Sequence, residues 1–380
     1  MAWPTRVLLG AGALARLGEE VRALGVRRPL VVTDRGVVAT GIADRVEAVL
    51  REAGLSPARH DGVRANPTDE DAAEGLAAYR AAGCDGIVAV GGGSAIDGAK
   101  LVALLVNHPP PLSRYDDAAG GDRFVTAPVP PLVAVPTTAG TGSEVGRAAV
   151  ATLPDTGRKT VIFSPRLMPR AAICDPALTV GLPRTLTAWT GMDALTHSVE
   201  AYVAAGFHPL ADAVALDGIR RVARALPVAV RDGTDLAART DMMVAALEGA
   251  MAFQKGLGAS HALAHALTPL CGVHHGLANA ILLATVAAFN APASPARLAR
   301  VAVALGEPEG ADDAALASRA AGRIAALARE VGIPGRLREA GVREEDLPAV
   351  AAKAFEDASH RTNPRPCTEE DLLALARAAW

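Results

Sequence analysis

Two different patterns of hydrophobic residues divide this chain, and together they constrain its fold more than any single motif does. Up to about residue 179, short apolar runs such as Pro29–Thr33 and Gly86–Val90 alternate with stretches of helical length. Such alternation is typical of a parallel sheet wrapped by helices. Beyond that point the strand-like runs disappear, and long Ala- and Leu-rich stretches interrupted by Gly and Pro take over. We therefore predict an α/β domain at residues 1–179 and an all-helical domain at residues 180–380.

The elements of the first domain can be placed from its apolar runs and from the turn residues between them. We predict strands at residues 6–10, 29–33, 86–90 and 131–136, and helices at residues 11–24, 42–53, 68–82 and 95–106. Thr68 follows Asn66-Pro67 and is expected to cap its helix. Residues 109–131 are rich in Pro and Gly and are expected to form a long irregular connection.

The predicted strand at Gly86–Val90 runs directly into Gly91-Gly92-Gly93-Ser94. A strand, a glycine run and a helix in this order form a natural phosphate site. Glycines let the backbone approach an anion, and the helix N-terminus offers unpaired N–H groups. The spacing differs from the GxGxxG of the usual dinucleotide fold, and a bare GGGS is also common in tight turns.

The second domain concentrates histidines in one short segment. Residues 261–276 read HALAHALTPLCGVHHG and contain four of the nine histidines in the chain. His261 and His265 share one face if this segment is helical. Helix-breaking residues before and around His275 predict that the helix ends before that residue; they are Pro269, Gly272 and Gly276.

Upstream of this segment, Asp193 and His197 are four residues apart and also share a face if they are helical. Either pair alone is common on solvated helix faces. One carboxylate and three imidazoles together predict a divalent-metal site with open positions for a substrate.

The joint pattern resembles the iron-containing (group III) alcohol dehydrogenase family, whose metal signature is Asp-x-x-x-His followed by an HxxxH…HG segment. The resemblance covers the whole chain, down to Asn363-Pro364-Arg365. It implies a Rossmann-like nucleotide-binding domain followed by an all-α metal-binding domain, the fold of dehydroquinate synthase and the iron alcohol dehydrogenases. It also implies the metal ligands, which are Asp193, His197, His261 and His275.

The resemblance extends to the residues that bind the cofactor. GGGSAIDGAK is similar to the pyrophosphate-binding loop of the family, which assigns that role to Gly92, Gly93 and Ser94. TTAGTGSE resembles the other cofactor loop, with Thr137, Thr138 and Thr141 as the hydrogen-bonding residues. Lys159 resembles a lysine that reaches the nicotinamide ribose, although an exposed strand lysine is an equally good interpretation.

Asp34 bears on the choice between NAD and NADP. It lies at the end of the second predicted strand, where a carboxylate can accept hydrogen bonds from the adenosine ribose and repel the 2′-phosphate of NADP. The alternative is a simple cap or turn residue before Arg35-Gly36. Relatives with Asp here tend to use NAD, so we expect NAD(H) as the cofactor.

The two domains together predict hydride transfer in a cleft between them, between nicotinamide and a small alcohol or aldehyde. The metal is expected to act as a Lewis acid on the substrate oxygen. We expect Fe2+, with Zn2+ as a substitute. His265 is not in the ligand set and is expected to relay the alcohol proton, since a neutral imidazole suits that work near pH 7. A buried histidine without a catalytic role is the alternative.

Phe253-Gln254-Lys255-Gly256 stands where many relatives have a pocket phenylalanine followed by small polar residues. Lys255 is six positions before His261, so an ammonium near the substrate is a natural hypothesis. Burying such a charge without a partner is costly, which favours an anionic substrate such as an ω-hydroxy acid or its semialdehyde, for instance 4-hydroxybutyrate. The alternative is a lysine that extends to the surface from a helix end.

Three other functions have to be weighed against this prediction. Maleylacetate reductases share the fold and transfer hydride without a metal, but a full set of ligands argues against them. Sugar-phosphate cyclases such as dehydroquinate synthase are lyases that need a basic phosphate-binding cluster, and this ligand region is nearly free of Lys and Arg. A non-enzymatic scaffold or filament subunit would need neither metal ligands nor cofactor loops.

Composition excludes further classes of protein. The net charge of −3 gives no electrostatic reason to bind nucleic acid or an anionic membrane. No apolar stretch reaches the about 18 residues of a membrane span, and the first apolar run is too short for a signal peptide. The four cysteines form no CxxC pair, as in proteins with reduced thiols. We expect a cytoplasmic homodimer or larger homo-oligomer.

Overall fold

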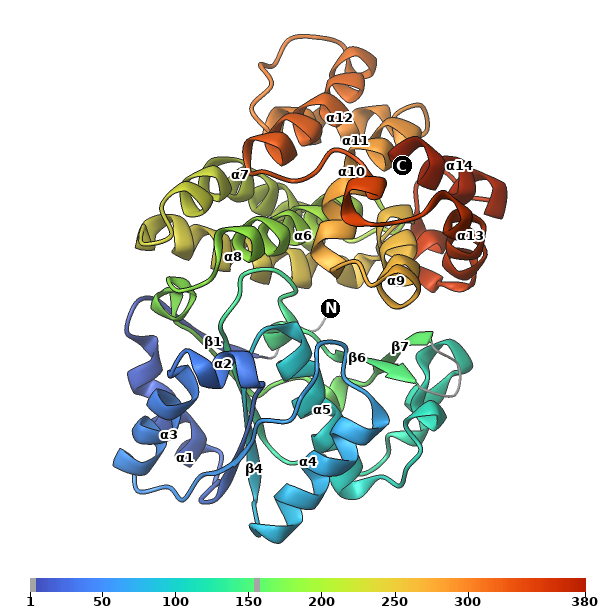
Figure 1. Ribbon diagram of the computed structural model, residues 1–380. Helices are drawn as coiled ribbons and strands as arrows, with labels where there is room; N and C mark the ends of the chain where they lie inside the picture. The colour runs from blue at the N-terminus through green and yellow to red at the C-terminus, as the bar shows by residue number, and fades with distance from the viewer. Residues whose placement is uncertain (1–4, 154–157) are drawn as a thin grey trace. The chain divides into compact units, whose positions relative to one another are not determined.

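The computed structural model describes residues 5–153 and 158–380 (Figure 1). The chain forms two compact units. The first extends to Thr138 and resumes at Ser143–Gly181, and the second contains Ala139–Gly142 and Leu182–Trp380. A short piece of the second predicted cofactor loop therefore belongs to the helical unit.

A six-stranded parallel sheet forms the centre of the first unit, in the order β1-β8-β5-β4-β2-β3. Its strands are β1 (Arg6–Leu9), β2 (Pro29–Val32), β3 (Ala58–His60), β4 (Gly86–Gly91), β5 (Leu132–Pro136) and β8 (Ala171–Cys174). A separate antiparallel pair is formed by β6 (Ala148–Leu153) and β7 (Arg158–Phe163). The four predicted strands are present. Strand β8 was not predicted because AAIC contains only one β-branched residue.

Both faces of this sheet are covered, which explains why its inner strands are apolar at every position. On one face, Val31, Val88 and Val133 pack with residues of α1 (Leu17–Ala23) and α3 (Ile42–Glu52). On the other, Leu30 and Ile87 pack against α4 (Asp69–Ala81) and α5 (Gly93–Asn107). Neighbouring residues of one strand thus enter opposite cores, as the two-residue repeat of a strand requires.

The helix predictions for the first unit are confirmed with two refinements. Thr68 caps α4 through a complete capping box with Asp71. The stretch predicted as one helix at residues 11–24 begins instead with the 3-10 turn η1 (Ala13–Arg16), and α1 follows it directly. A short helix, α2 (Arg35–Ala39), follows β2 and was not predicted. The connection at residues 109–131 contains three short 3-10 turns.

The described residues of the second unit form helices and connections only. Its helices are α6 (Arg184–Val203), α7 (Pro209–Arg231), α8 (Leu236–Ala252), α9 (Ala259–Cys271), α10 (His275–Asn290), α11 (Pro295–Ala304), α12 (Asp313–Glu330), α13 (Leu347–Glu356) and α14 (Glu369–Ala379). The predicted fold class, a parallel α/β part followed by an all-helical part, is confirmed. Among the described residues, no helix combines the length and the hydropathy of a membrane span.

Helix α6 lies at the centre of the second unit and packs against α7, α8 and α10. Residues 191–203 are buried without interruption, so polar side chains of this helix must find partners inside the protein. Glycines on the three neighbours allow the close approach. An added Cβ would lie 2.7 Å from Ser198 Oγ at Gly218, 3.1 Å from His197 Cβ at Gly249 and 2.5 Å from Trp189 O at Gly276.

The predicted break before His275 is also confirmed. Helix α9 ends at Cys271, and Gly272 follows it in the left-handed conformation with φ of 69°. Only glycine adopts this conformation without strain. Helix α10 then starts at His275, so His275 is a first-turn residue of a separate helix and not a continuation of the His261 face.

Candidate metal centre and cofactor loops

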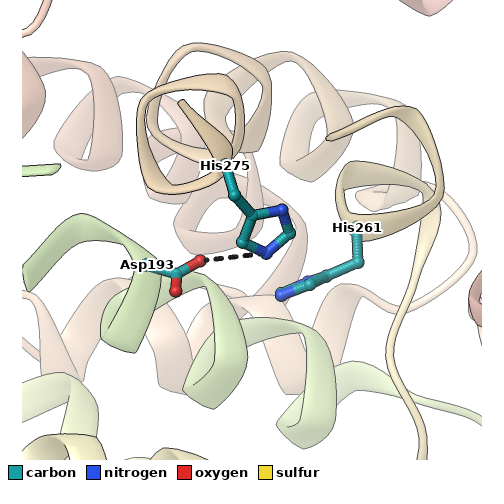
Figure 2. A group of neighbouring side chains, drawn as sticks. All are labelled: Asp193, His261 and His275. Carbon is teal, nitrogen blue, oxygen red and sulfur yellow. Dashed lines mark ion pairs between the residues drawn. The ribbon is translucent and has the colours of Figure 1, made fainter. Parts of the chain in front are cut away.

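Three of the four predicted metal ligands meet inside the helical unit. Asp193 comes from α6, His261 from α9 and His275 from the first turn of α10, and one ligand atom of each lies within 4.8 Å of the others. Figure 2 shows the carboxylate and the two imidazoles pointing toward one another. Asp193 Oδ1 lies 3.6 Å from His275 Nε2. Asp193 and His261 are buried, whereas His275 is partly exposed.

The surroundings of His261 fit a bound cation. Its Nδ1 lies 2.6 Å from Glu200 Oε2. Its Nε2 is buried and has no hydrogen-bond partner in the part of the chain that the structure describes. Leaving a buried polar atom unpaired costs about 1–3 kcal/mol, so a metal ion on this nitrogen would remove a penalty. A carboxylate with imidazoles suits borderline ions such as Fe2+ and Zn2+.

The fourth predicted ligand, His197, lies beside this group but outside the three-residue cluster. Its ring stacks on that of His261, with centroids 4.6 Å apart and an interplanar angle of 28°. Burial lowers the pKa of His197 to about 4, against the weaker opposing effect of Asp193. The ring is therefore neutral at physiological pH, as a metal ligand has to be. Ligation by His197 stays a prediction.

Two residues that contact the predicted ligands were missed in the sequence analysis. Glu200 contacts His261 as described above, and Asn279 Nδ2 donates to Asp193 Oδ1 at 2.8 Å. The same nitrogen lies 3.2 Å from His275 Nε2. Both residues could have been recognised from their spacing in the sequence. Glu200 follows Asp193 by seven residues and Asn279 follows His275 by four, which places each on the helix face of a ligand.

His265, the predicted proton relay, lies one turn from His261 and is held by an acidic partner. Its Nδ1 is 2.8 Å from Asp357 Oδ2, and its ring stacks on that of His275 with centroids 5.2 Å apart. Burial raises the pKa of Asp357, but the charge and hydrogen bond of His265, together with hydrogen bonds from Ser359, outweigh burial and hold it below its usual range. This carboxylate is therefore ionised and fixes the ring. The relay role stays a prediction.

The structure corrects the reason given for an anionic substrate. Lys255 is buried in the 3-10 turn η8 (Phe253–Lys255), and its Nζ donates to Asp212 Oδ1 at 2.6 Å and to Tyr202 O at 2.7 Å. The ammonium is thus already paired, and it does not extend to the surface either. The substrate role was inferred from the closeness of Lys255 to His261 in the sequence, which could not reveal that Asp212 pairs with the ammonium. Phe253 lies near the ligands, with its ring centroid 5.2 Å from that of His197.

In the α/β unit, the predicted phosphate loop has the expected form. Strand β4 ends at Gly91, and Gly92 is the N-cap of the 15-residue helix α5 without a side-chain cap. An added Cβ at Gly91 would lie 2.6 Å from Ala95 Cβ, and its φ of 145° is open only to glycine. Gly92, Gly93 and Ser94 therefore present the uncapped N-terminus that binds anions in other proteins.

Asp34 has the position that the sequence predicted and also its alternative role. Its Oδ1 accepts a hydrogen bond from Val37 N at 2.9 Å and so caps α2. Its Oδ2 faces the phosphate loop, since an added Cβ at Gly91 would lie 3.2 Å away from it. One oxygen is therefore engaged in the fold, while the other faces the loop where a dinucleotide is expected.

The second cofactor loop starts beside the first. Thr137 N donates to Gly91 O at 3.0 Å, which joins the ends of β5 and β4. Thr138 lies against Gly92, where an added Cβ would be 3.3 Å from its side chain. Thr141 belongs to the piece that groups with the helical unit. Lys159 lies on β7, opposite Thr152 of β6. The cofactor contacts of these residues stay predictions.

A buried lysine that the sequence analysis did not single out fixes the segment after this loop. Lys100 of α5 is fully buried. Its Nζ donates to four oxygens within 2.9 Å, namely Ser143 O, Ser143 Oγ, Gly146 O and Ala148 O. Asp97 lies 3.9 Å away and accepts from Ser143 Oγ. Burial lowers the pKa of Lys100 to about 8, although the charges of Asp97 and Glu144 oppose the shift.

Comparison with known proteins agrees with this arrangement over the whole length of the chain. The sequence model of the family described as iron-containing alcohol dehydrogenase matches residues 4–176. The model described as Fe-containing alcohol dehydrogenase family, C-terminal, matches residues 187–380.

Individual relatives are similar over nearly their full length. A 4-hydroxybutyrate dehydrogenase of Cupriavidus necator is 45% identical, with 98% of this chain and 97% of the relative covered. An NAD-dependent methanol dehydrogenase of Bacillus methanolicus is 37% identical, with 99% and 98% covered. A crystal structure of a 1,3-propanediol oxidoreductase superimposes with a TM-score of 0.96 at 42% identity, covering 99% of this chain and 98% of that one.

Proposed function

Since the chain belongs to the iron-containing alcohol dehydrogenase family, we propose that it is a metal-dependent, NAD-linked oxidoreductase that interconverts a small ω-hydroxy acid and its semialdehyde. The observation that carries the metal-dependent part is the meeting of Asp193, His261 and His275 from three separate helices. The substrate class is supported by the similarity to a 4-hydroxybutyrate dehydrogenase. A plain short alcohol or diol is the second candidate, supported by the likeness to a 1,3-propanediol oxidoreductase.

The metal site has named ligands in this proposal. Asp193, His261 and His275 hold a divalent ion, Fe2+ in the first place and Zn2+ as a substitute, with His197 as the fourth ligand. When bound, the ion supplies Lewis-acid polarisation of the substrate oxygen. Neutral imidazoles and a carboxylate are the protonation states that ligands need, and the lowered pKa of His197 agrees with this.

Proton transfer is assigned to His265. Its Nδ1 faces Asp357, so the ring offers Nε2 as the acceptor of the alcohol proton. The ionised carboxylate of Asp357 stabilises the imidazolium that forms when the proton arrives. In aldehyde reduction the same nitrogen returns the proton to the product oxygen.

The cofactor is NAD(H). Backbone N–H groups of Gly92, Gly93 and Ser94 bind its pyrophosphate at the N-terminus of α5. Asp34 accepts from the adenosine ribose with the oxygen that does not cap α2. Further hydrogen bonds come from the second loop and the β6–β7 pair, from Thr137, Thr138, Thr141 and Lys159.

The assembly and location of the protein are also part of the proposal. We place it in the cytoplasm as a homodimer or larger homo-oligomer that needs neither nucleic acid nor a membrane. All four cysteines are free thiols, as expected in a reducing compartment. Light scattering of the purified protein measures the oligomeric state directly.

The test combines metal content with turnover on the same sample. NADH oxidation is measured with succinic semialdehyde, butanal and 3-hydroxypropanal in the wild type and in His261→Ala. We expect about one divalent ion per chain in the wild type, and in the variant loss of the ion and a loss of turnover of more than roughly 100-fold. His274→Ala is the matched control, since this neighbour of His275 is not in the ligand group and should keep its metal.

The outcomes separate the alternatives. Full activity after chelation, with metal loss confirmed, would point to a metal-independent reductase and end the proposed mechanism. Equal kcat/KM for succinic semialdehyde and butanal would remove the ω-hydroxy acid and leave a general alcohol dehydrogenase.

A further inference from the structure

We infer that Glu200 is a positioning residue of the metal site: one buried carboxylate on α6 caps α9 and, through the same contacts, fixes the ring of His261 with Nε2 toward Asp193 and His275. This inference rests on the proposed function, because it assigns a role toward the metal. It adds to the ligand set a residue that holds a ligand without touching the ion.

The contacts of Glu200 all lie in the first turn of α9. Its carboxylate accepts from Gly258 N at 3.1 Å, Ser260 N at 2.7 Å and His261 N at 3.3 Å, and it lies 2.6 Å from His261 Nδ1. Glu200 is only 2% exposed. A buried carboxylate with four N–H donors is fully paired, which makes its position well defined.

This arrangement replaces the usual cap of a helix. The N-cap of α9 is Gly258, which provides no side-chain hydrogen bond. A Cβ at Gly258 would lie 2.7 Å from Glu200 Oε1 and 2.8 Å from Asn363 Oδ1. The space where a local capping side chain would stand is therefore occupied by a carboxylate from α6. The negative charge also suits the positive end of the α9 dipole.

The same carboxylate sets the chemistry of His261. Both oxygens of Glu200 already accept from backbone N–H groups, so the geometry assigns the proton of the His261 ring to the nitrogen that faces them, Nδ1. Nε2 then carries the lone pair, and it is the nitrogen that lacks a hydrogen-bond partner among the described residues. A hydrogen bond from the second nitrogen of a metal-binding histidine to a carboxylate fixes the ring and raises its basicity.

The helix that holds Glu200 also holds the ligand Asp193. They are seven positions apart, so both lie on the same face of α6, with the predicted ligand His197 between them. Both residues belong to one helix that is buried without interruption from residue 191 to residue 203. The start of α9 is thereby fixed to the same helix that provides the carboxylate ligand.

The first experiment measures Zn2+ affinity by competition with a chelator in Glu200→Gln and in the wild type. The variant keeps the size of the side chain and one acceptor oxygen, and it loses the charge and the second acceptor. We expect Zn2+ to bind about 10–100-fold more weakly, the range typical of carboxylates that support a metal-binding histidine. The absorption spectrum of the Co2+-loaded protein should change as well, because the His261 ring is no longer fixed.

Asn363→Ala is the matched control. Asn363 Oδ1 accepts from Ala259 N at 3.3 Å in the same helix turn and from Asn290 Nδ2 at 3.0 Å. We expect this variant to lower thermal stability and to leave Zn2+ affinity unchanged. If both variants lose affinity in proportion to their loss of stability, Glu200 serves only the fold, and the inference is overturned.

A second measurement needs no variant and covers the case in which Glu200→Gln does not fold. In 15N NMR of Zn2+-loaded wild type, His261 should carry its proton on Nδ1 and bind the metal through Nε2. A proton on Nε2, or metal on Nδ1, contradicts the inference. A wild type that binds no metal overturns the proposed function itself, whereas wild-type affinity in Glu200→Gln overturns only the role of Glu200.

Discussion

Lys100 in the α/β unit and Glu200 in the helical unit have similar surroundings and opposite kinds of side chain, one basic and one acidic. Each is buried, and each collects several polar groups from a distant part of the chain. Lys100 gathers four oxygens, three of them backbone carbonyls, and Glu200 gathers four nitrogens, three of them backbone amides. The fourth partner makes the difference. For Lys100 it is the hydroxyl of Ser143, and for Glu200 it is the imidazole of His261, one of the predicted metal ligands.

Because of this difference, we expect Lys100 to serve the stability of the fold and Glu200 to serve the predicted metal site as well. The charge of Lys100 fixes the segment that follows a cofactor loop, and no predicted ligand or cofactor residue accepts from it directly. The charge of Glu200 is placed at both a helix start and a predicted metal ligand, His261. Removal of the lysine should therefore weaken the fold with the metal site intact, and removal of the glutamate should weaken metal binding beyond its effect on the fold.

The largest effect is expected for Lys100→Met. The substitution leaves three buried carbonyls without their donor and Asp97 without its cation, so the free energy of unfolding should fall by about 3–5 kcal/mol. Urea unfolding measures the loss, and metal analysis of the folded fraction should show wild-type content. A parallel loss of metal would break the comparison, because it would tie Lys100 to the metal site.

The next largest effect is expected for Asn279, which, like Glu200, contacts the predicted metal ligands. Asn279→Ala removes the amide that donates to Asp193 Oδ1, so the carboxylate is free to rotate. Metal affinity should fall by about 10–100-fold in a chelator competition. Ser260→Ala is the matched control, since it removes only the hydroxyl that donates to Asn279 Oδ1 at 3.3 Å. Equal losses in both variants would show that packing and not the hydrogen bond to Asp193 is responsible.

Asp34 of the α/β unit can be compared with Glu200, because it is also a carboxylate that caps a helix. It is predicted to bind the adenosine ribose of the cofactor. Asp34→Asn keeps an oxygen for Val37 N and removes the charge. The ratio of kcat/KM for NADH to that for NADPH should fall roughly tenfold, as one unit of charge repulsion near the 2′-phosphate is lost. A wild type that already uses NADPH as well as NADH would contradict the assignment of Asp34.

The smallest effect is expected for Glu248, a partly buried carboxyl whose Oε2 lies 3.4 Å from Arg221 Nε. Burial and the nearby Asp217 raise the pKa of Glu248 to about 8. The folded state therefore holds this proton more tightly than the unfolded state does. Its contribution to stability is present below the unfolded pKa and is lost as pH rises through about 8.

Glu248→Gln keeps a donor for Asp217 and removes the titration. Its melting temperature should fall less steeply between pH 5 and pH 8 than that of the wild type, by roughly the linkage of one carboxyl group. Thermal unfolding across this range measures the difference. Parallel curves for the two proteins would show that Glu248 is ionised in the fold.

The sequence predicted those parts that depend on local spacing. Strands β2, β4 and β5 are continuous apolar runs, and a strand buried on both faces has no other pattern. The positions of Asp193 and His261 on helix faces followed from helical periodicity, and the break before His275 followed from Gly272, whereas Pro269, which was also expected to break the helix, lies inside α9. Strands β3, β6, β7 and β8 were not predicted; β3 and β8 have only three and four residues, too few for a clear pattern.

Contacts between distant residues were not predictable in the same way. The oxygens that accept hydrogen bonds from Lys100 are 43 or more residues away in sequence, and no local pattern marks them. Lys255 was assigned to the substrate because His261 is near in sequence, but Asp212, 43 residues away, holds its ammonium. Glu200 lies on the helix face that was predicted to carry the ligands. Knowing that α6 is buried would have singled out this carboxylate, because a buried charge needs partners. The sequence alone does not show that α6 is buried.

The pairing of Lys100 and Lys255 inside the protein has a practical consequence for amine chemistry. The chain contains only four lysines, and these two are buried and fully engaged. Lys159 and Lys353 are the partly exposed ones. An acylating reagent or an amine-reactive support would therefore modify few sites and leave both buried clusters intact. Because Lys159 is a predicted cofactor residue, immobilisation of the enzyme through its lysines is best carried out with NAD bound.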